Sequence, residues 1–147
     1  MKKNYVLTFI CISFFIISLA NINSVSAYHM EGDFLSLSNS KTSFNIFEGK
    51  LLIVDSTASW CEPCEKQIGN LKKVYNTHND TLNILTLSVS PVSDSITVME
   101  ELKSNTESPW IFGIDYENKF MDKMKLTILP TLYLFDEDGA LLTQWKD

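Results

Sequence analysis

The pattern of hydrophobic and polar residues alternates along the chain between short apolar runs, typical of strands, and helical spacing. Residues 51–54 form a continuous apolar run rich in branched side chains, which is typical of a strand buried on both faces. From residue 62 to residue 75 the apolar positions recur at helical intervals and predict a helix that ends near residues 77–80. The apolar stripe of this helix is expected to comprise Ile68, Leu71, Val74 and Tyr75.

Two short alternating segments precede the apolar run and predict a hairpin. Residues 34–37 and 43–47 alternate apolar and polar side chains, and a polar turn at residues 38–41 joins them. The hairpin is therefore expected to lie next to the central strand.

After the first helix the pattern predicts a strand over residues 82–89 and then a second helix. Asp94 is placed to cap that helix, because a short acidic side chain can accept the unpaired N–H groups of its first turn. The side chains expected to face inward from it are Ile96, Met99 and Leu102.

The last third of the chain predicts a strand and helix unit followed by two strands. Residues 109–113 lead into a short extended segment, and a helical stretch follows Asp115. Its inward side chains are expected to be Phe120, Met121 and Met124. Residues 129–135 and 141–145 predict two antiparallel strands joined by a turn that contains Gly139.

Length and charge limit the function classes. The 147 residues suffice for one domain, and they include no arginine. Ten lysines and 18 acidic residues follow residue 27, which leaves a net charge of −8 there. We expect no nucleic-acid partner, because phosphate binding needs clustered cations.

The first 27 residues predict a signal peptide. Lys2 and Lys3 precede an apolar run over residues 6–20, and small residues end the segment at Ala27. We expect cleavage after Ala27 and export to the periplasmic or extracellular side of a membrane, with residues 28–147 as the mature domain. The alternative is an uncleaved membrane anchor through residues 6–20.

The chemistry of the chain is expected to reside in Cys61 and Cys64, which open the helix after the apolar strand. The unpaired N–H groups at a helix start stabilise a thiolate, so the pKa of Cys61 should fall. Two intervening residues, with Pro63 in the first turn, bring Cys64 close enough to attack a disulfide formed on Cys61. This spacing predicts thiol–disulfide exchange, with Cys61 as the exposed nucleophile and Cys64 as the resolving thiol.

Two simpler interpretations of the cysteine pair are less favoured. A zinc site needs four ligands, and the other candidates are only Cys11 in the leader, His29 and His78. A purely structural disulfide across two residues closes a tiny loop and gains little entropy. We therefore expect no metal and no cofactor beyond the cysteine pair itself.

Residues 54–64 resemble the active-site strand and turn of the thioredoxin superfamily, and they are most similar to its exported TlpA/ResA-like branch. The Trp-Cys-x-Pro-Cys signature carries the resemblance, which covers residues 32–145. It implies an α/β thioredoxin-like fold: a central mixed β-sheet flanked by helices, with an N-terminal β-hairpin and a central insertion. Members of the family normally finish with a C-terminal helix, which this sequence lacks, so we expect either a truncated chain or a shortened variant with apolar sheet surface exposed.

The resemblance also implies roles for individual residues. Pro130 would be cis and lie against the cysteine turn, which leaves the backbone of Leu129 free to pair with an extended substrate. Trp60 is expected to contact the same substrate. Asp55 is expected to shuttle the proton of the Cys64 thiol, with a pKa raised towards neutrality by burial. The alternative for Asp55 is a solvated residue at the end of the strand.

The direction of electron flow is expected to be reductive. Glu62 places a negative charge beside Cys61 and disfavours its thiolate, so Glu62 and Pro63 together would tune the pair to a low potential. The family implies cysteine-containing protein substrates, a membrane electron donor, and a role in cytochrome c maturation or disulfide repair.

Three alternatives to this interpretation remain. One is an oxidant that inserts disulfides, and another is a thioredoxin-like protein-binding module without turnover. A peroxiredoxin-like peroxidase is disfavoured, because Thr57 stands four residues before Cys61 rather than three and no arginine is present to polarise a peroxide.

Overall fold

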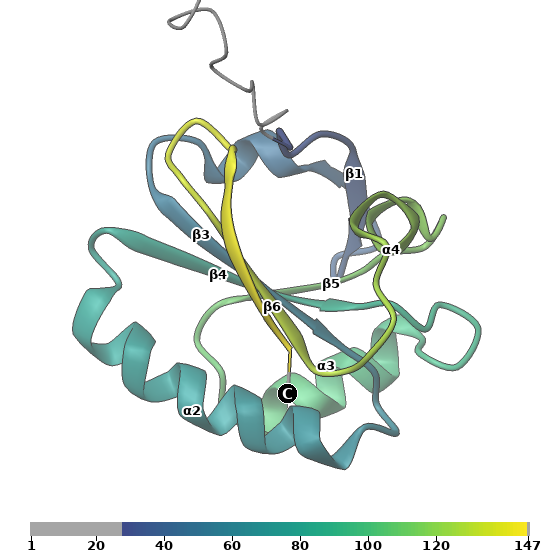
Figure 1. The fold of residues 1–147 in the computed structure, drawn as a ribbon. Coiled ribbons are helices and arrows are strands. Elements are labelled where there is room, and N and C mark those ends of the chain that lie inside the picture. The colour runs from purple at the N-terminus through teal and green to yellow at the C-terminus, as the bar shows by residue number, and fades with distance from the viewer. Residues whose placement is uncertain (1–27, 147) are drawn as a thin grey trace, which may run out of the picture.

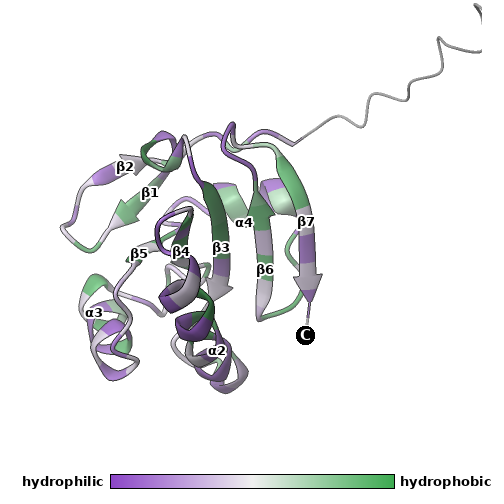
Figure 2. Ribbon diagram, turned by 90° about the vertical axis from the view of Figure 1, so that its left-hand side faces the viewer, coloured by the Kyte–Doolittle hydropathy of each residue, from purple (hydrophilic) through white to green (hydrophobic). Residues whose placement is uncertain are grey.

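The computed structural model describes residues 28–146, which form a single sheet with helices on both of its faces (Figure 1). Within these residues the sheet has seven strands in the order β2-β1-β5-β4-β3-β6-β7, which Figure 2 shows edge to edge. The elements are β1 Asp33–Ser36, β2 Lys41–Ser43, the 3-10 helix η1 Phe44–Phe47, β3 Leu51–Thr57, α2 Glu62–His78, β4 Leu82–Ser88, α3 Ile96–Asn105, β5 Ile111–Ile114, α4 Lys119–Met124, β6 Thr131–Phe135 and β7 Leu141–Lys146.

Strand β3 lies inside the sheet and is paired along its length on both edges. It runs parallel to β4 and antiparallel to β6, and every residue from Leu52 to Thr57 is buried. Branched apolar side chains suit such a strand because both of its faces are covered. The sequence prediction of a mixed sheet around this strand is confirmed.

Side chains that alternate along β3 enter two separate cores. Ile53 packs with Ile68 and Met99 beneath α2 and α3. Val54 packs with Phe44 and Phe120 beneath η1 and α4, on the opposite face. Figure 1 shows α2 and α3 together on one side of the sheet and α4 on the other. The pleat of one strand therefore holds both layers of helices in place.

The predicted second strand of the hairpin is wrong over residues 43–47. The paired segment is Lys41–Ser43, and Phe44–Phe47 forms a 3-10 helix. Ser43 caps the start of this helix, because its side chain accepts a hydrogen bond from the N–H of Asn45. Residues three apart fall on one side of a 3-10 helix. Phe44 and Phe47 are consequently both buried, whereas Ile46 is 53% exposed.

The predicted helices are found, with three changes of detail. In α4, Met121 is partly exposed and lies outside the core that Phe120 and Met124 enter. In α2, Ile68, Leu71 and Tyr75 pack into the core as expected, but Val74 lies at the edge of the stripe and is 37% exposed. Helix α3 is capped by Ser95, whose side chain accepts the N–H of Val98, and not by Asp94.

The described part of the chain ends on β7, at the edge of the sheet. Leu142 and Trp145 on this strand are 55% and 50% exposed. None of the helices in the described residues is both long enough and apolar enough to cross a membrane. The predicted signal peptide at residues 1–27 lies outside the described residues.

The contact between β5 and β1 predicts a strict requirement for glycine at residue 113. A Cβ atom there would lie 2.3 Å from Cδ2 of Phe34, whose ring is buried against Phe44 and Phe47. We expect Gly113→Ala to lower the free energy of unfolding in urea by about 3 kcal/mol. The matched control is Gly69→Ala in α2, where a Cβ meets nothing within 4 Å. It should raise stability by about 0.5–1 kcal/mol, and equal effects of the two variants would contradict this packing.

Candidate active site

The two cysteines lie where strand β3 is followed by helix α2. They form a disulfide with an S–S distance of 2.00 Å and a Cα–Cα distance of 5.3 Å. Cys61 is the N-cap of α2 without a side-chain capping bond, and Pro63 falls in the first turn. The first N–H groups of a helix have no partner within it, so the helix tolerates proline there and offers partial positive charge to a sulfur.

The two sulfurs differ in their access to the surface. Cys61 is 5% exposed and Cys64 is 1% exposed, so Cys61 is more covered in the disulfide form than the sequence suggested. Cys61 nevertheless lines an open groove of about 570 Å³, and Cys64 is not among the lining residues. An incoming sulfur would therefore reach Cys61 first.

The groove beside Cys61 joins three segments that are distant in the sequence. Its lining residues besides Cys61 are Trp60, Glu62 and Pro63 from the active-site turn, Val89 and Ser90 after β4, and Met121, Leu126, Thr127, Ile128 and Leu129 from α4 and the segment before β6. Trp60 is 66% exposed, and Leu129 packs directly against the two cysteines. The peptide bond between Leu129 and Pro130 is cis, as expected, and Pro130 is buried at the start of β6. The groove is mainly apolar, and its single charged lining residue is Glu62.

Asp55 is fully buried in β3, which excludes the solvated alternative. It lies two residues after Ile53 and so faces the α2 side of the sheet. Its Oδ2 accepts a hydrogen bond from Thr86, whose Oγ1 in turn accepts from the Trp110 indole; Oδ1 has no partner among the described residues. Burial raises the pKa of Asp55 to about 7, and the hydrogen bond from Thr86 opposes the rise only in part.

Asp94 is a buried polar residue whose place the sequence did not reveal. It is 2% exposed and accepts hydrogen bonds from Ser59, beside the cysteine turn, and from Ser88 at the end of β4. The capping prediction failed because Ser95, one residue later, has the same capping chemistry. One feature of the sequence could have indicated this role. Ser59 and Ser88 stand near the ends of two apolar strands, where their hydroxyl groups can donate hydrogen bonds to a nearby acid.

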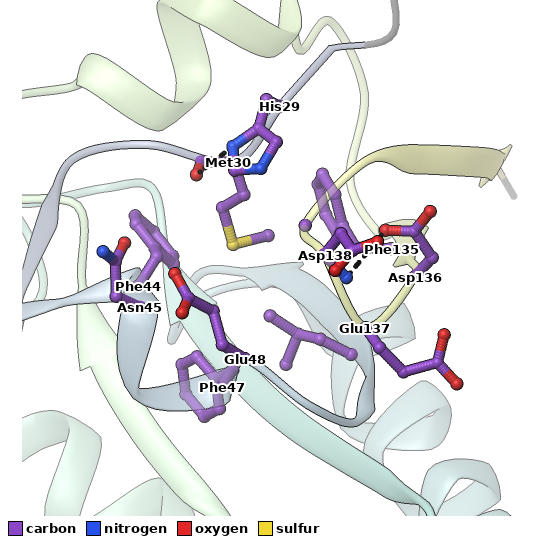
Figure 3. A pocket seen from close by; sticks show the side chains of 12 residues that line it. His29, Met30, Phe44, Asn45, Phe47, Glu48, Phe135, Asp136, Glu137 and Asp138 are labelled. Atoms are coloured by element: carbon purple, nitrogen blue, oxygen red, sulfur yellow. Dashed lines mark hydrogen bonds between the residues drawn. The ribbon is translucent and has the colours of Figure 1, made fainter.

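A smaller cavity lies beside Leu52, near the start of β3, whereas the cysteines follow the end of that strand. Figure 3 shows the side chains that line it. It is lined by apolar side chains from η1 and β6 and by polar groups of the β6–β7 turn. The lining residues are His29, Met30, Phe44, Asn45, Phe47, Glu48, Leu52, Phe135, Asp136, Glu137, Asp138 and Gly139. Within residues 28–146 no three His, Cys, Asp or Glu side chains are grouped so that they could hold a metal ion.

A family profile described as Thioredoxin-like matches residues 49–141. The chain belongs to the thioredoxin-like family. The matched residues run from the turn before β3 to the start of β7 and so include both cysteines and the cis-proline segment.

Curated relatives in the thioredoxin-like family are named for disulfide chemistry. The chain is 22% identical over 113 residues to the sporulation thiol-disulfide oxidoreductase A of Bacillus subtilis, which covers 76% of this chain and 64% of the relative. It is also 22% identical over 111 residues to the thiol-disulfide oxidoreductase ResA of Bacillus thuringiensis, covering 75% of this chain and 62% of that protein. The chain thus spans somewhat less than two thirds of the length of these relatives.

Solved structures show the same fold. The thioredoxin domain of a thiol-disulfide oxidoreductase from Bacteroides vulgatus superposes with a TM-score of 0.72 at 19% identity, covering 82% of this chain and 89% of that one. StoA from Bacillus subtilis superposes with a TM-score of 0.66 at 19% identity, covering 82% and 90%. The thioredoxin-like fold expected from the sequence is confirmed.

The environment of Asp55 predicts a characteristic dependence of stability on pH. The pKa of Asp55 is about 7 in the folded chain against an ordinary value of 3.8, so the folded state binds the proton more tightly. The free energy of unfolding should therefore fall as pH rises from about 4 to about 7, by up to a few kcal/mol. Asp55→Asn should make this fall smaller, whereas Asp80→Asn, an exposed control, should leave it unchanged. Urea unfolding of the oxidised protein at pH 5 and pH 8 measures the difference, and parallel curves for wild type and Asp55→Asn would contradict the assignment.

Proposed function

We propose that this thioredoxin-like chain is a thiol–disulfide oxidoreductase that exchanges the Cys61–Cys64 pair with disulfides of protein substrates. The observation that carries the proposal is the placement of the disulfide: Cys61 caps α2 and lines the groove, while Cys64 lies buried behind it. This arrangement places Cys61 at the groove, with the Cys64 sulfur within bonding reach of it, as the reaction requires.

The reduced pair acts in two balanced steps. The Cys61 thiolate attacks one sulfur of the substrate disulfide, which breaks that bond, forms a mixed disulfide and releases one substrate thiolate. The Cys64 thiol then loses its proton and attacks the Cys61 sulfur, which releases the second substrate thiolate. The substrate gains two electrons and the protein is left with the Cys61–Cys64 disulfide seen in the structure.

Asp55 is proposed to accept the proton of the Cys64 thiol. It is buried on the face of the sheet that α2 covers, and its Oδ1 has no other partner among the described residues. A pKa of about 7 allows it to take up and release a proton near neutral pH. Because Cys64 is almost completely buried, bulk water has little access to its thiol. The thiol therefore needs a base inside the protein to take its proton.

The groove supports an extended protein segment as the substrate. Trp60 is exposed and Leu129 packs against the cluster that contains the two cysteines, and both residues line the groove. We propose that the backbone of Leu129, ahead of the cis Pro130, pairs with the substrate backbone and that Trp60 covers its side chains. No external cofactor enters this scheme, because the cysteine pair itself carries the electrons.

The proposed direction is reduction outside the cytoplasm. Glu62 is an exposed acid next to Cys61, in the first turn of α2, where its charge disfavours the thiolate and lowers the potential of the pair. Residues 1–27 would direct export or anchor the chain. A reductase in an oxidising compartment needs an electron donor in the membrane, and its clients would be the cysteines of apocytochrome c or mispaired disulfides.

The two cysteines should give opposite results when each is replaced. In a Cys11→Ser background, Cys64→Ser should trap the mixed disulfide, because nothing remains to release Cys61. Cys61→Ser should lower the rate of peptide-disulfide reduction by about a thousandfold or more, because the accessible nucleophile is gone. Mass spectrometry of alkylated products and a rate assay with a peptide disulfide measure both. If the wild-type chain bound the peptide without reducing it, and Cys61→Ser bound it equally well, a binding module without turnover would be favoured instead.

A further inference from the structure

Asp94 is a buried acid that the proposed exchange chemistry does not use. It accepts hydrogen bonds from the backbone N–H of Ser59 at 3.0 Å, from the Ser59 hydroxyl, and from the Ser88 hydroxyl at 2.6 Å. Burying a carboxyl group is costly unless its oxygens are bonded, and hydrogen bonds to a carboxylate are among the stronger ones in proteins. Three donors on one side chain that is 2% exposed therefore make a firm link.

Two of the three donors belong to the turn that carries the reactive cysteine. The N–H of Cys61 donates to the carbonyl of Ala58 at 3.0 Å, so residues 58–61 close into a tight turn. Ser59 lies inside this turn and presents both its backbone N–H and its hydroxyl to Asp94. Asp94 thus fastens the active-site turn to the segment between β4 and α3.

A second bond connects the same two segments. The indole N–H of Trp60 donates to the Ser90 hydroxyl at 3.3 Å, and the backbone N–H of Ser90 donates to the Ser88 hydroxyl at 3.2 Å. Ser88 is also the third donor to Asp94. The network therefore ties Trp60 and Ser90, which both line the groove, to the buried carboxylate.

We propose that Asp94 is a positioning residue for thiol–disulfide exchange, acting through Ser59 to hold the turn that sets where the Cys61 sulfur lies. This inference rests on the proposed function. The exchange reaction needs the attacking sulfur in line with the substrate disulfide and close to the helix start, and small displacements of a reacting group are costly. Cys61 has no side-chain cap bond of its own, so its position depends on the turn before it.

The test is a double-mutant cycle on the purified full-length chain in a Cys11→Ser background. The probe is a peptide disulfide, and the readout is its second-order rate constant with the reduced protein from pH 5 to pH 9. The variants are Asp94→Ala, Asp94→Asn, Ser59→Ala and the two double variants. Thr106→Val is the matched control, because it removes partly buried hydrogen bonds at the end of α3, outside the network around Asp94.

We expect Asp94→Ala to lower the rate constant roughly tenfold or more, and Ser59→Ala roughly threefold, since its backbone N–H still reaches Asp94. Each double variant should match its Asp94 single variant within about twofold, because Asp94 acts through Ser59. Ser59→Ala should also shift the pH–rate profile to higher pH, as the sulfur is held less firmly at the helix start. Thr106→Val should change the stability of the protein but leave the rate constant and its pH profile unchanged.

Independent, multiplicative losses for Asp94 and Ser59, or an equal loss in Thr106→Val, would overturn the positioning role. If Asp94→Ala does not fold, the cycle of Asp94→Asn with Ser59→Ala decides the question in the same way. Absence of exchange in the wild-type chain would overturn the proposed function and this inference together. Wild-type exchange with multiplicative losses would overturn this inference alone.

Discussion

The junction between β3 and α2 is the constraint on which the site depends. Strand β3 is paired on both edges and buried on both faces, so its last residue, Thr57, has a fixed position. The turn that follows is closed by the bond from Cys61 to Ala58. Helix α2 is held by side chains such as Ile68, which packs into the core beneath the sheet. The two cysteines thus occupy the first turn of a helix whose position and direction are set by the whole fold.

Two buried acids serve this junction in different ways. Asp55 has a single donor among the described residues, Thr86, and burial raises its pKa to about 7. Asp94 instead accepts three hydrogen bonds from Ser59 and Ser88. An acid with few donors is suited to gaining and losing a proton, and an acid with many donors is suited to holding backbone segments together. The two proposed roles, proton transfer at Asp55 and positioning at Asp94, thus fall on two different acids.

The sequence predicted the parts of the structure that depend on local pattern. The apolar strand before Cys61, the helix after it and the two final strands follow from periodicity, and the cis Pro130 follows from a family resemblance. The burial of Asp55 was also expected, because the residue continues an apolar strand. In these cases neighbours in the sequence are also neighbours in the structure.

The parts that the sequence did not predict depend on distant contacts. Phe44 and Phe47 fit an alternating strand as well as a 3-10 helix, and only the core they enter selects the helix. Asp94 stands beside another good capping residue, and its true donor, Ser59, lies 35 residues earlier in the chain. Strand β1 packs against β5, where Gly113 leaves room for Phe34. The apolar and polar pattern of neither segment indicates that the two strands pair.

The equilibrium reduction potential of the Cys61–Cys64 pair decides whether the pair acts as a reductant. It is measured in glutathione buffers, with thiols counted by alkylation and mass. We expect one two-electron transition with a midpoint near or below about −250 mV, which makes the pair a reductant that needs an electron donor. A midpoint near about −120 mV would contradict it, because the pair would then insert disulfides and the charge of Glu62 would not control the potential.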